Sequence, residues 1–328
     1  MTTLAEIREK LKAAELRGAG ENKVGDKSVY PFWNLKEGTE AVIRFLPDAN
    51  QDNTFFWVER QIIKLPFAGI KGDPENKLVT VQVPCNEMYG GTCPILTAVR
   101  PWFKSPDLED MGRKYWKKRS YIFQGFVVTD GLGEEEPPEN PIRRFVLSPQ
   151  VYQLVRSALV DPELEELPTD YVHGVDFRIK KGSKGGYADY STSSWSRRER
   201  PLNDTELAAI EQFGLYNLAD FLPKRPSDVE LKVMEEMFEA SVDGKPYDTE
   251  AWGNYFKPAG MNQNSGDPVK PAVQTTTSQV ANSHVDDDPP FDVDPPAVKS
   301  TATKTEPTAS SDNRAQDILA MIRNRQKS

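Results

Sequence analysis

Alternating apolar and polar residues predict a series of short β-strands in the first two thirds of the chain. Val175, Phe177 and Ile179 alternate with charged residues, as in a strand with one buried face. A glycine-rich turn at 182–186 leads into a second strand, so residues 174–200 are expected to form a β-hairpin. Runs of β-branched and aromatic residues predict further strands at 39–46, 55–65, 78–83, 120–129 and 142–147.

Apolar residues spaced by three or four positions predict helices around these strands. Ser148 followed by Pro149 marks the start of a helix that runs to about residue 160. Helical spacing recurs at 2–16, 204–213, 215–222, 228–242 and 312–325. The expected fold class is therefore mainly β with flanking helices, an α+β fold.

Composition divides the chain into three parts. Residues 1–27 form an amphipathic arm and linker, whose helix docks either on the protein's own core or on a neighbouring subunit. Residues 28–257 form the core, with an acidic helical part from about residue 203. Residues 258–328 have the composition of a disordered tail. Its terminal helix 312–325 is either a peptide that docks on a partner or a nascent helix without a role.

The net charge of −9 argues at first against a nucleic-acid ligand, but the charges are unevenly distributed. Residues 203–250 contain twelve acidic and four basic residues, and 284–296 contains five Asp without Lys or Arg. In contrast, 174–200 and 100–123 each contain seven Lys or Arg against three acidic residues, a local net charge of +4. Nucleic-acid binding responds to such local patches more than to the total charge.

Both basic stretches also contain several aromatic residues, and we call them the hairpin block (174–200) and the 100–123 block. Unpaired bases stack on aromatic rings while phosphates meet cations, so this composition favours binding of single-stranded nucleic acid. The alternative for each block is an ordinary strand or solvated face whose rings belong to the core. If the strands of the two blocks share a barrel, both blocks would line one groove.

Four segments in a fixed order give the chain a family resemblance. They are EAVIRFLP at 40–47, YGGTCP at 89–94, the strand from KKRSY to VVTD at 117–130, and DFRIKKGSKGGYADY at 176–190. With the helix after Ser148, the chain resembles the single-stranded-DNA-binding replication proteins of T-even-type tailed bacteriophages over roughly residues 28–200.

The resemblance implies an OB-like barrel core that holds single strands in a cleft without sequence preference. It implies an N-terminal arm for self-association along DNA and a C-terminal tail that recruits replication and recombination proteins. The implied role is to coat and protect unpaired DNA during phage replication, recombination and repair, in the cytoplasm of the infected bacterial host.

Carried over by position, the family's DNA-contacting rings fall on Tyr115, Phe145, Tyr187 and Tyr190, with Trp102 or Phe103 as a further contact. Another family ring falls on Ile122, which cannot stack with a base. The full candidate set combines these positions with the cations and rings of both blocks. It consists of Trp102, Phe103, Arg113, Lys114, Tyr115, Trp116, Lys117, Lys118, Arg119, Tyr121, Arg144, Phe145, Lys180, Lys181, Lys184, Tyr187 and Tyr190.

The metal site of the family is not expected in this chain. The family binds zinc through one His and three Cys, and only Cys85 and Cys93 match. The third Cys position falls on Leu96, and the region of the His reads VERQII at 58–63. Structural zinc takes four N or S ligands, so two thiols cannot close the site. We expect no cofactor, and two partly buried thiols repacked by Ile95 and Leu96.

Other functions remain as alternatives. A metal-dependent nuclease needs clustered carboxylates, whereas Asp176 and Asp189 stand alone in the hairpin block, with His173 at its edge. A coat for single-stranded RNA, or a replication scaffold acting through the tail, would also fit parts of the pattern. No nucleophile–base pair, phosphate loop or dinucleotide fingerprint is recognised, so no enzyme is expected. No run of about 18 apolar residues suggests a membrane span, and two cysteines fit a reducing cytoplasm.

Overall fold

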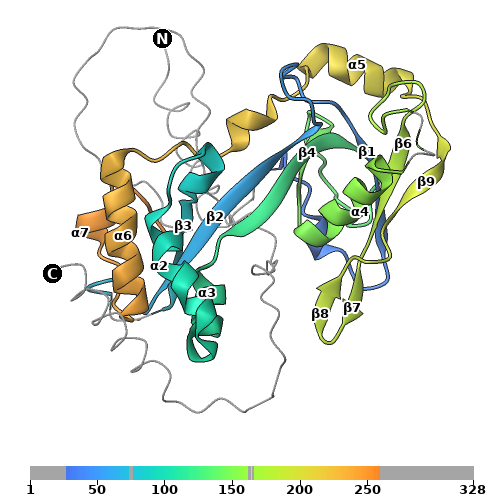
Figure 1. Ribbon diagram of the computed structural model, residues 1–328. Helices are drawn as coiled ribbons and strands as arrows, with labels where there is room; N and C mark the ends of the chain where they lie inside the picture. The colour runs from blue at the N-terminus through green and yellow to red at the C-terminus, as the bar shows by residue number, and fades with distance from the viewer. Residues whose placement is uncertain (1–26, 74–76, 162–163, 165, 259–328) are drawn as a thin grey trace, which may run out of the picture.

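The computed structural model describes residues 27–73, 77–161, 164 and 166–258 of the 328-residue chain. The predicted helix 2–16, nearly all of the arm 1–27, and the tail with its helix 312–325 lie outside these described residues. The described part is a mixed α+β fold built on an antiparallel sheet with helices around it (Figure 1). The expected α+β class is therefore confirmed.

The main sheet has seven strands in the order β3-β2-β4-β1-β6-β9, and β5 pairs with β4 off this path. These strands are β1 (Glu40–Phe45), β2 (Trp57–Phe67), β3 (Val79–Pro84), β4 (Lys118–Thr129), β5 (Ile142–Leu147), β6 (Val175–Lys180) and β9 (Ser194–Glu199). A separate two-stranded ribbon pairs β7 (Gly182–Lys184) with β8 (Tyr187–Asp189). The strands predicted from alternation all form.

The predicted hairpin at 174–200 is divided differently from the expectation. The strand after the glycine-rich turn is not one continuous partner of β6. Instead β8 pairs only with β7, and β9 returns to β6 with Phe177 opposite Trp195. The ribbon therefore projects beyond the main sheet, as the lower right of Figure 1 shows.

The helices lie mainly before β4 and after β9. The α-helices are α2 (Pro94–Val99), α3 (Glu109–Tyr115), α4 (Pro149–Leu159), α5 (Asp204–Phe213), α6 (Asp228–Val242) and α7 (Thr249–Trp252). The 3-10 helices are η1 (Phe32–Asn34), η2 (Asn86–Tyr89), η3 (Arg100–Lys104), η4 (Pro106–Leu108) and η5 (Leu218–Phe221). Ser148 caps α4 as predicted, because its side chain accepts a hydrogen bond from the Val151 N–H.

The predicted helix at 215–222 is wrong for most of its length, since only the short η5 forms there. Gly214 ends α5 with a φ of +71°, and Pro223 follows soon after, so the segment has little room for a stable helix. In addition, the backbone N–H and C=O of Tyr216 both bond to the Gln124 side chain at 2.8 Å. These bonds satisfy the Tyr216 backbone without a helical turn.

Two large hydrophobic clusters share the long strand β2. The first contains Ile63, Leu65 and Phe67 of β2 together with β3, α2, α3 and α6. The second contains Trp57 of the same strand together with β1, β4, β5, β6 and α4. Figure 1 shows these groups on either side of the β2–β4 pair, which joins them.

Phe45 lies at the centre of the second cluster. Its ring is fully buried and lies 4.9–6.2 Å, centre to centre, from five other aromatic rings. The strand beside it approaches so closely that a Cβ on Gly125 would lie 2.1 Å from the Arg44 carbonyl oxygen. No side chain larger than hydrogen fits at position 125 without moving one of the two strands.

Replacing Phe45 with Ala should lower the free energy of unfolding by about 3–5 kcal/mol, because the cavity it leaves is lined by rings that cannot collapse fully. Urea denaturation followed by circular dichroism measures this change. The matched control is Phe55→Ala, since the Phe55 side chain is 57% exposed and its removal should cost less than about 1 kcal/mol. Equal losses of stability in the two variants would contradict this account of the core.

Candidate nucleic-acid interface

The aromatic residues of the 100–123 block lie mostly in the protein interior. This stretch folds into η3, η4 and α3 before β4 begins, and its apolar side chains pack into the first cluster. Trp102 stacks against Phe238, and the Tyr115 hydroxyl lies 3.1 Å from that of Ser241. Phe103 is buried and Trp116 is half-buried against it. Trp102, Phe103 and Tyr115 therefore present no open face to a base, whereas Trp116 keeps part of its surface in solvent.

Several cations of the 100–123 block are paired with carboxylates. The buried Lys117 ammonium donates to Glu87 at 2.9 Å, and Arg100 contacts the same carboxylate. Burial opposes the ionisation of Glu87, but the hydrogen bonds and charges of Lys117 and Arg100 lower its pKa below the usual value. Arg113 pairs with Glu109 at 2.5 Å within α3, while Lys114 is exposed.

The run Lys117–Lys118–Arg119 does not form one continuous basic face. Side chains alternate across a strand, so Lys118 and Arg119 at the start of β4 point to opposite faces of the sheet. Arg119 lies 3.7 Å from Glu59 of the neighbouring strand, on the same face as Tyr121. Lys118 shares the other face with Ser120, whose hydroxyl accepts a hydrogen bond from Arg60.

The candidate residues of β5 face in two directions. Phe145 is fully buried in the second cluster. The Arg144 guanidinium lies over the Phe221 ring at 3.8 Å, and its backbone bonds to Ser28 and Tyr30. Arg144 is half-buried, so its charge is partly withdrawn from solvent.

The hairpin block contains the one candidate aromatic residue in the described chain that is largely exposed. Tyr187 at the start of β8 is 78% exposed, and Lys180 and Lys184 beside it are also exposed. In contrast, Tyr190 is buried edge-on against Phe32, and the half-buried Lys181 donates to the Trp33 carbonyl. The ribbon therefore exposes the Tyr187 ring and Lys184, and Lys180 at the end of β6 adds a second exposed cation.

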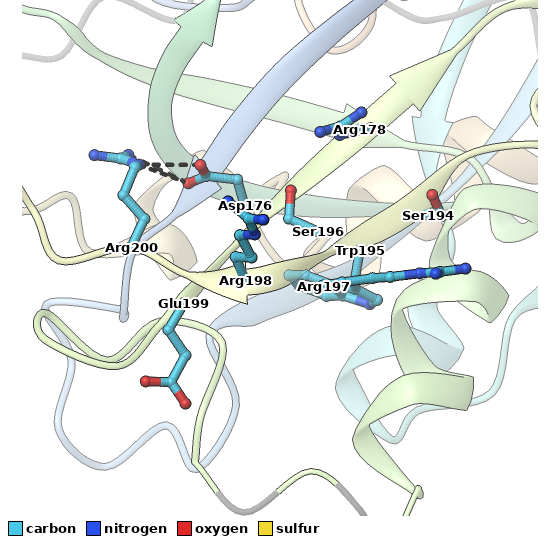
Figure 2. A pocket seen from close by; sticks show the side chains of 9 residues that line it. All are labelled: Asp176, Arg178, Ser194, Trp195, Ser196, Arg197, Arg198, Glu199 and Arg200. Atoms are coloured by element: carbon cyan, nitrogen blue, oxygen red, sulfur yellow. Dashed lines mark hydrogen bonds and ion pairs between the residues drawn. The ribbon is translucent and has the colours of Figure 1, made fainter.

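A group of arginines that was not predicted lies beside this ribbon. Arg178, Arg197, Arg198 and Arg200 line an open hollow of about 440 Å³ on β6 and β9, together with Trp195 (Figure 2). Within the described part of the chain, Arg178, Arg197 and Arg198 make no ion pair with a carboxylate. The dashed lines of Figure 2 accordingly join only Arg200 to Asp176.

Arg200 is held by a charge network at one side of the hollow. It donates to Asp176 at 3.0 Å and to both oxygens of Glu206, at 2.8 and 3.0 Å. Behind it, the fully buried Arg44 contacts Asp176 at 3.4 Å and donates to the Asp170 carbonyl at 2.7 Å. Burial lowers the pKa of Arg44, while Asp176 counteracts this effect. The network fixes Arg200 and neutralises Asp176, so the hollow keeps its positive character.

Helix α4 connects the two blocks. The Gln150 side chain donates to Asp189 of β8 at 2.7 Å and accepts from the Tyr190 N–H. Two residues further along the helix, Tyr152 stacks on Tyr121 of β4 with ring centres 3.6 Å apart. Burial, with the nearby charge of Glu59, raises the pKa of Tyr121 to about 12. The beginning of β4 and the ribbon thus lie against the same helix.

The sequence reasoning missed Arg178, Arg197 and Arg198 as individual site residues, although it assigned them to the hairpin block. The signal was present in SRRER at 196–200, where three arginines follow one another closely. Tyr152 was also missed, because a single Tyr in an amphipathic helix usually packs against the core.

The two cysteines are free and fully buried, rather than partly buried as expected, in the same cluster as Ile95 and Leu96. Among the described residues, no group of three or more His, Cys, Asp or Glu side chains is placed to hold a metal ion. These two thiols do not fit the four-ligand zinc site of the resembled family.

A scan of the sequence against protein-family models finds no matching family, and a search of curated proteins finds no match. None of the helices in the described ranges has both the length and the apolar character needed to cross a bilayer.

Replacing Glu206 with Gln should destabilise the protein at neutral pH, since Arg200 loses its bidentate partner. Burial opposes ionisation of Glu206, but the hydrogen bonds from Arg200 lower its pKa in the folded state. The carboxylate therefore stabilises the fold above about pH 4.5, and this stabilisation disappears as pH falls through the lowered folded-state pKa. Urea midpoints of both proteins should differ at pH 7 and converge as the pH falls below the folded-state pKa of Glu206. A difference independent of pH would show that the charge of Glu206 is not the cause.

Proposed function

We propose that this protein binds single-stranded DNA without sequence preference. The observation that carries the proposal is a surface of exposed cations without carboxylate partners among the described residues, beside an exposed ring. This basic surface consists of Arg178, Lys180, Lys184, Arg197 and Arg198, with Tyr187 on the adjoining ribbon. Cations that are free of internal pairs can release their counterions to phosphates, and the ring can stack on an unpaired base.

The arrangement of strands supports an OB-like core for the proposed binding protein. Strands β5, β4, β1, β6 and β9 pair in succession, and α4 packs against β4, β5 and β9. Five antiparallel strands with a helix against them are the ingredients of an OB-fold, which commonly presents a strand face to single-stranded nucleic acid. The resemblance of residues 28–200 to phage single-stranded-DNA-binding proteins leads to the same proposal.

The chemistry of the basic surface favours binding over catalysis and a nonspecific mode over base reading. Long Arg and Lys side chains on strand faces contact phosphates, and one stacking ring accepts any base. Asp176 is engaged by Arg44 and Arg200, so it is not a free carboxylate for metal-assisted cleavage. We accordingly propose a non-enzymatic DNA-binding protein that coats and protects unpaired DNA in phage replication, recombination and repair.

The proposal includes segments outside the described residues. Residues 1–27 would mediate self-association along DNA, and the tail from 258 would recruit replication and recombination proteins. Among the candidate residues of the sequence, the proposal relies on Lys180, Lys184 and Tyr187. In the 100–123 block, Lys114 is exposed, whereas Arg113 pairs with Glu109 and Arg119 with Glu59.

The direct test is titration of the full-length protein with a fluorescent, unstructured DNA oligonucleotide at several salt concentrations. If the five cations of the basic surface each neutralise a phosphate, log K should fall with log salt with a slope of about −3.5. Competition with unpaired RNA and with duplex DNA distinguishes an RNA coat and a duplex binder from the proposed function. Absence of salt-dependent binding would refute it and favour the scaffold alternative.

The double variant Arg178→Gln, Arg198→Gln should weaken DNA binding and reduce the magnitude of the salt slope by about 1.4, or about 0.7 for each phosphate that is no longer neutralised. The matched control is Lys71→Gln, Lys245→Gln, which removes two cations that pair with Asp248 and Asp243 near α7 and α6. Equal effects of the two double variants would mean that only total charge matters and that the basic surface is not the site.

Tyr187→Ala should weaken binding of single-stranded DNA by about 5- to 150-fold, equivalent to about 1–3 kcal/mol for the stacking of one base. Tyr187→Phe keeps the ring and should bind within about twofold of the native protein, since the exposed hydroxyl is not needed for stacking. The same oligonucleotide titration measures both variants. Equal weakening in the Ala and Phe variants would argue against stacking at this residue.

A further inference from the structure

Cys85 and Cys93, the two cysteines of the chain, form a buried pair that the proposed DNA binding does not use. Cys85 directly precedes η2, and Cys93 directly precedes α2. Both side chains are fully buried in the first cluster. Asn86 and Thr92, their neighbours in the chain, are joined by a hydrogen bond, so the two cysteines lie side by side at the base of one loop.

The segment between the cysteines is folded back on itself, which keeps the thiols together. The Asn86 side chain donates to the Thr92 carbonyl at 2.9 Å, and the Gly91 N–H donates to the Asn86 carbonyl at 3.1 Å. Gly90 has a φ of +74°, and a Cβ at Gly91 would lie 2.4 Å from the Asn86 amide nitrogen. Because this loop is already closed in the folded protein, forming a disulfide between its ends costs little further chain entropy.

The surroundings of the pair are suited to a change in the oxidation state of the sulfurs. The hydrogen bond from Cys85 lowers the pKa of Cys93 against the effect of burial, and backbone N–H groups reinforce this change. Gly90 and Thr92 on the connecting loop are exposed, so the pair lies beneath a surface segment. Local opening of such a loop admits a neutral oxidant about the size of water.

We propose that Cys85 and Cys93 are a modification site, at which a peroxide oxidises them to a reversible intramolecular disulfide. One sulfur, as its thiolate, attacks a peroxide oxygen, so the O–O bond breaks, hydroxide leaves and a sulfenic acid forms. The second sulfur then attacks the sulfenic sulfur, the S–O bond breaks, and water leaves after proton transfer. In total, two thiols are oxidised and one hydrogen peroxide is reduced to two water molecules.

A disulfide between Cys85 and Cys93 would affect the 100–123 block through Glu87. This carboxylate lies two residues after Cys85, on η2, and holds both Lys117 and Arg100. A disulfide joins the two sulfur atoms by a bond of about 2.05 Å, so it fixes the position of η2 relative to α2. Oxidation therefore restricts the movement of Glu87, the carboxylate that pairs with Lys117 and Arg100.

The test treats the full-length folded protein with hydrogen peroxide, then alkylates remaining thiols under denaturing conditions. Trypsin releases both cysteines on one peptide, residues 78–104, because Pro101 blocks cleavage after Arg100 and no other Lys or Arg lies between Lys77 and Lys104. The expected product is this peptide about 2 Da lighter and without alkylation, restored to two free thiols by dithiothreitol. Oxidation of Met88 on the same peptide adds oxygen and is distinguished by mass.

A thermal melt supplies the second measurement. The oxidised protein should melt about 5 °C higher than the reduced protein, because a disulfide at a preformed contact restricts the unfolded chain. Cys93→Ser is the control, and peroxide should neither lighten its peptide by about 2 Da nor raise its melting temperature. Neither readout involves DNA, so this proposal and the proposed function can fail separately.

Free glutathione serves as the control that the peroxide is active. With glutathione fully oxidised, two alkylatable thiols in the protein would overturn the proposal. A sulfinic acid in place of the disulfide, a disulfide between two protein molecules, or a lower melting temperature after oxidation would also overturn it.

Discussion

The fold depends on the antiparallel pairing of β2 with β4. Trp57 to Ile62 of β2 pair with the first half of β4 beside the second cluster, and β2 continues from Ile63 to Phe67 into the first cluster. A strand buries its side chains only where other elements cover it, so one cluster alone would leave half of β2 uncovered. The two clusters therefore stabilise one another through a shared backbone ladder, and the surfaces of both are held in a fixed relation.

The sequence predicts strands such as β3 and β6 well because every second residue of each faces the core. The pattern of Val175, Phe177 and Ile179 requires only local information, and β6 has the predicted ends. The pairing of β9 with β6 and the separate β7–β8 ribbon could not be derived in this way. Strand pairing depends on contacts between residues distant in sequence, which alternation alone does not encode.

The candidate site was harder to predict, since composition does not distinguish an exposed ring from a buried one. Trp102 and Tyr115 have basic neighbours, yet the helices that carry them turn the rings into the first cluster and leave the charges outside. The partners Glu87 and Glu59 come from other segments, so the neutralisation of Lys117 and Arg119 follows only from the tertiary structure. The useful distinction in this protein is between cations with internal partners and cations without them.

Gln150 gives the projecting ribbon a mechanical role. Its side-chain amide hydrogen-bonds to Asp189 at the end of β8 and to the next residue, Tyr190. Its helix, α4, packs on β4 through the stacked rings of Tyr152 and Tyr121. A load on the ribbon is therefore shared between Gln150, the buried Tyr190, and the Lys181 backbone, which bonds to Gly38 and Thr39. The base of the ribbon is braced from two sides, by α4 and by the segment that precedes β1.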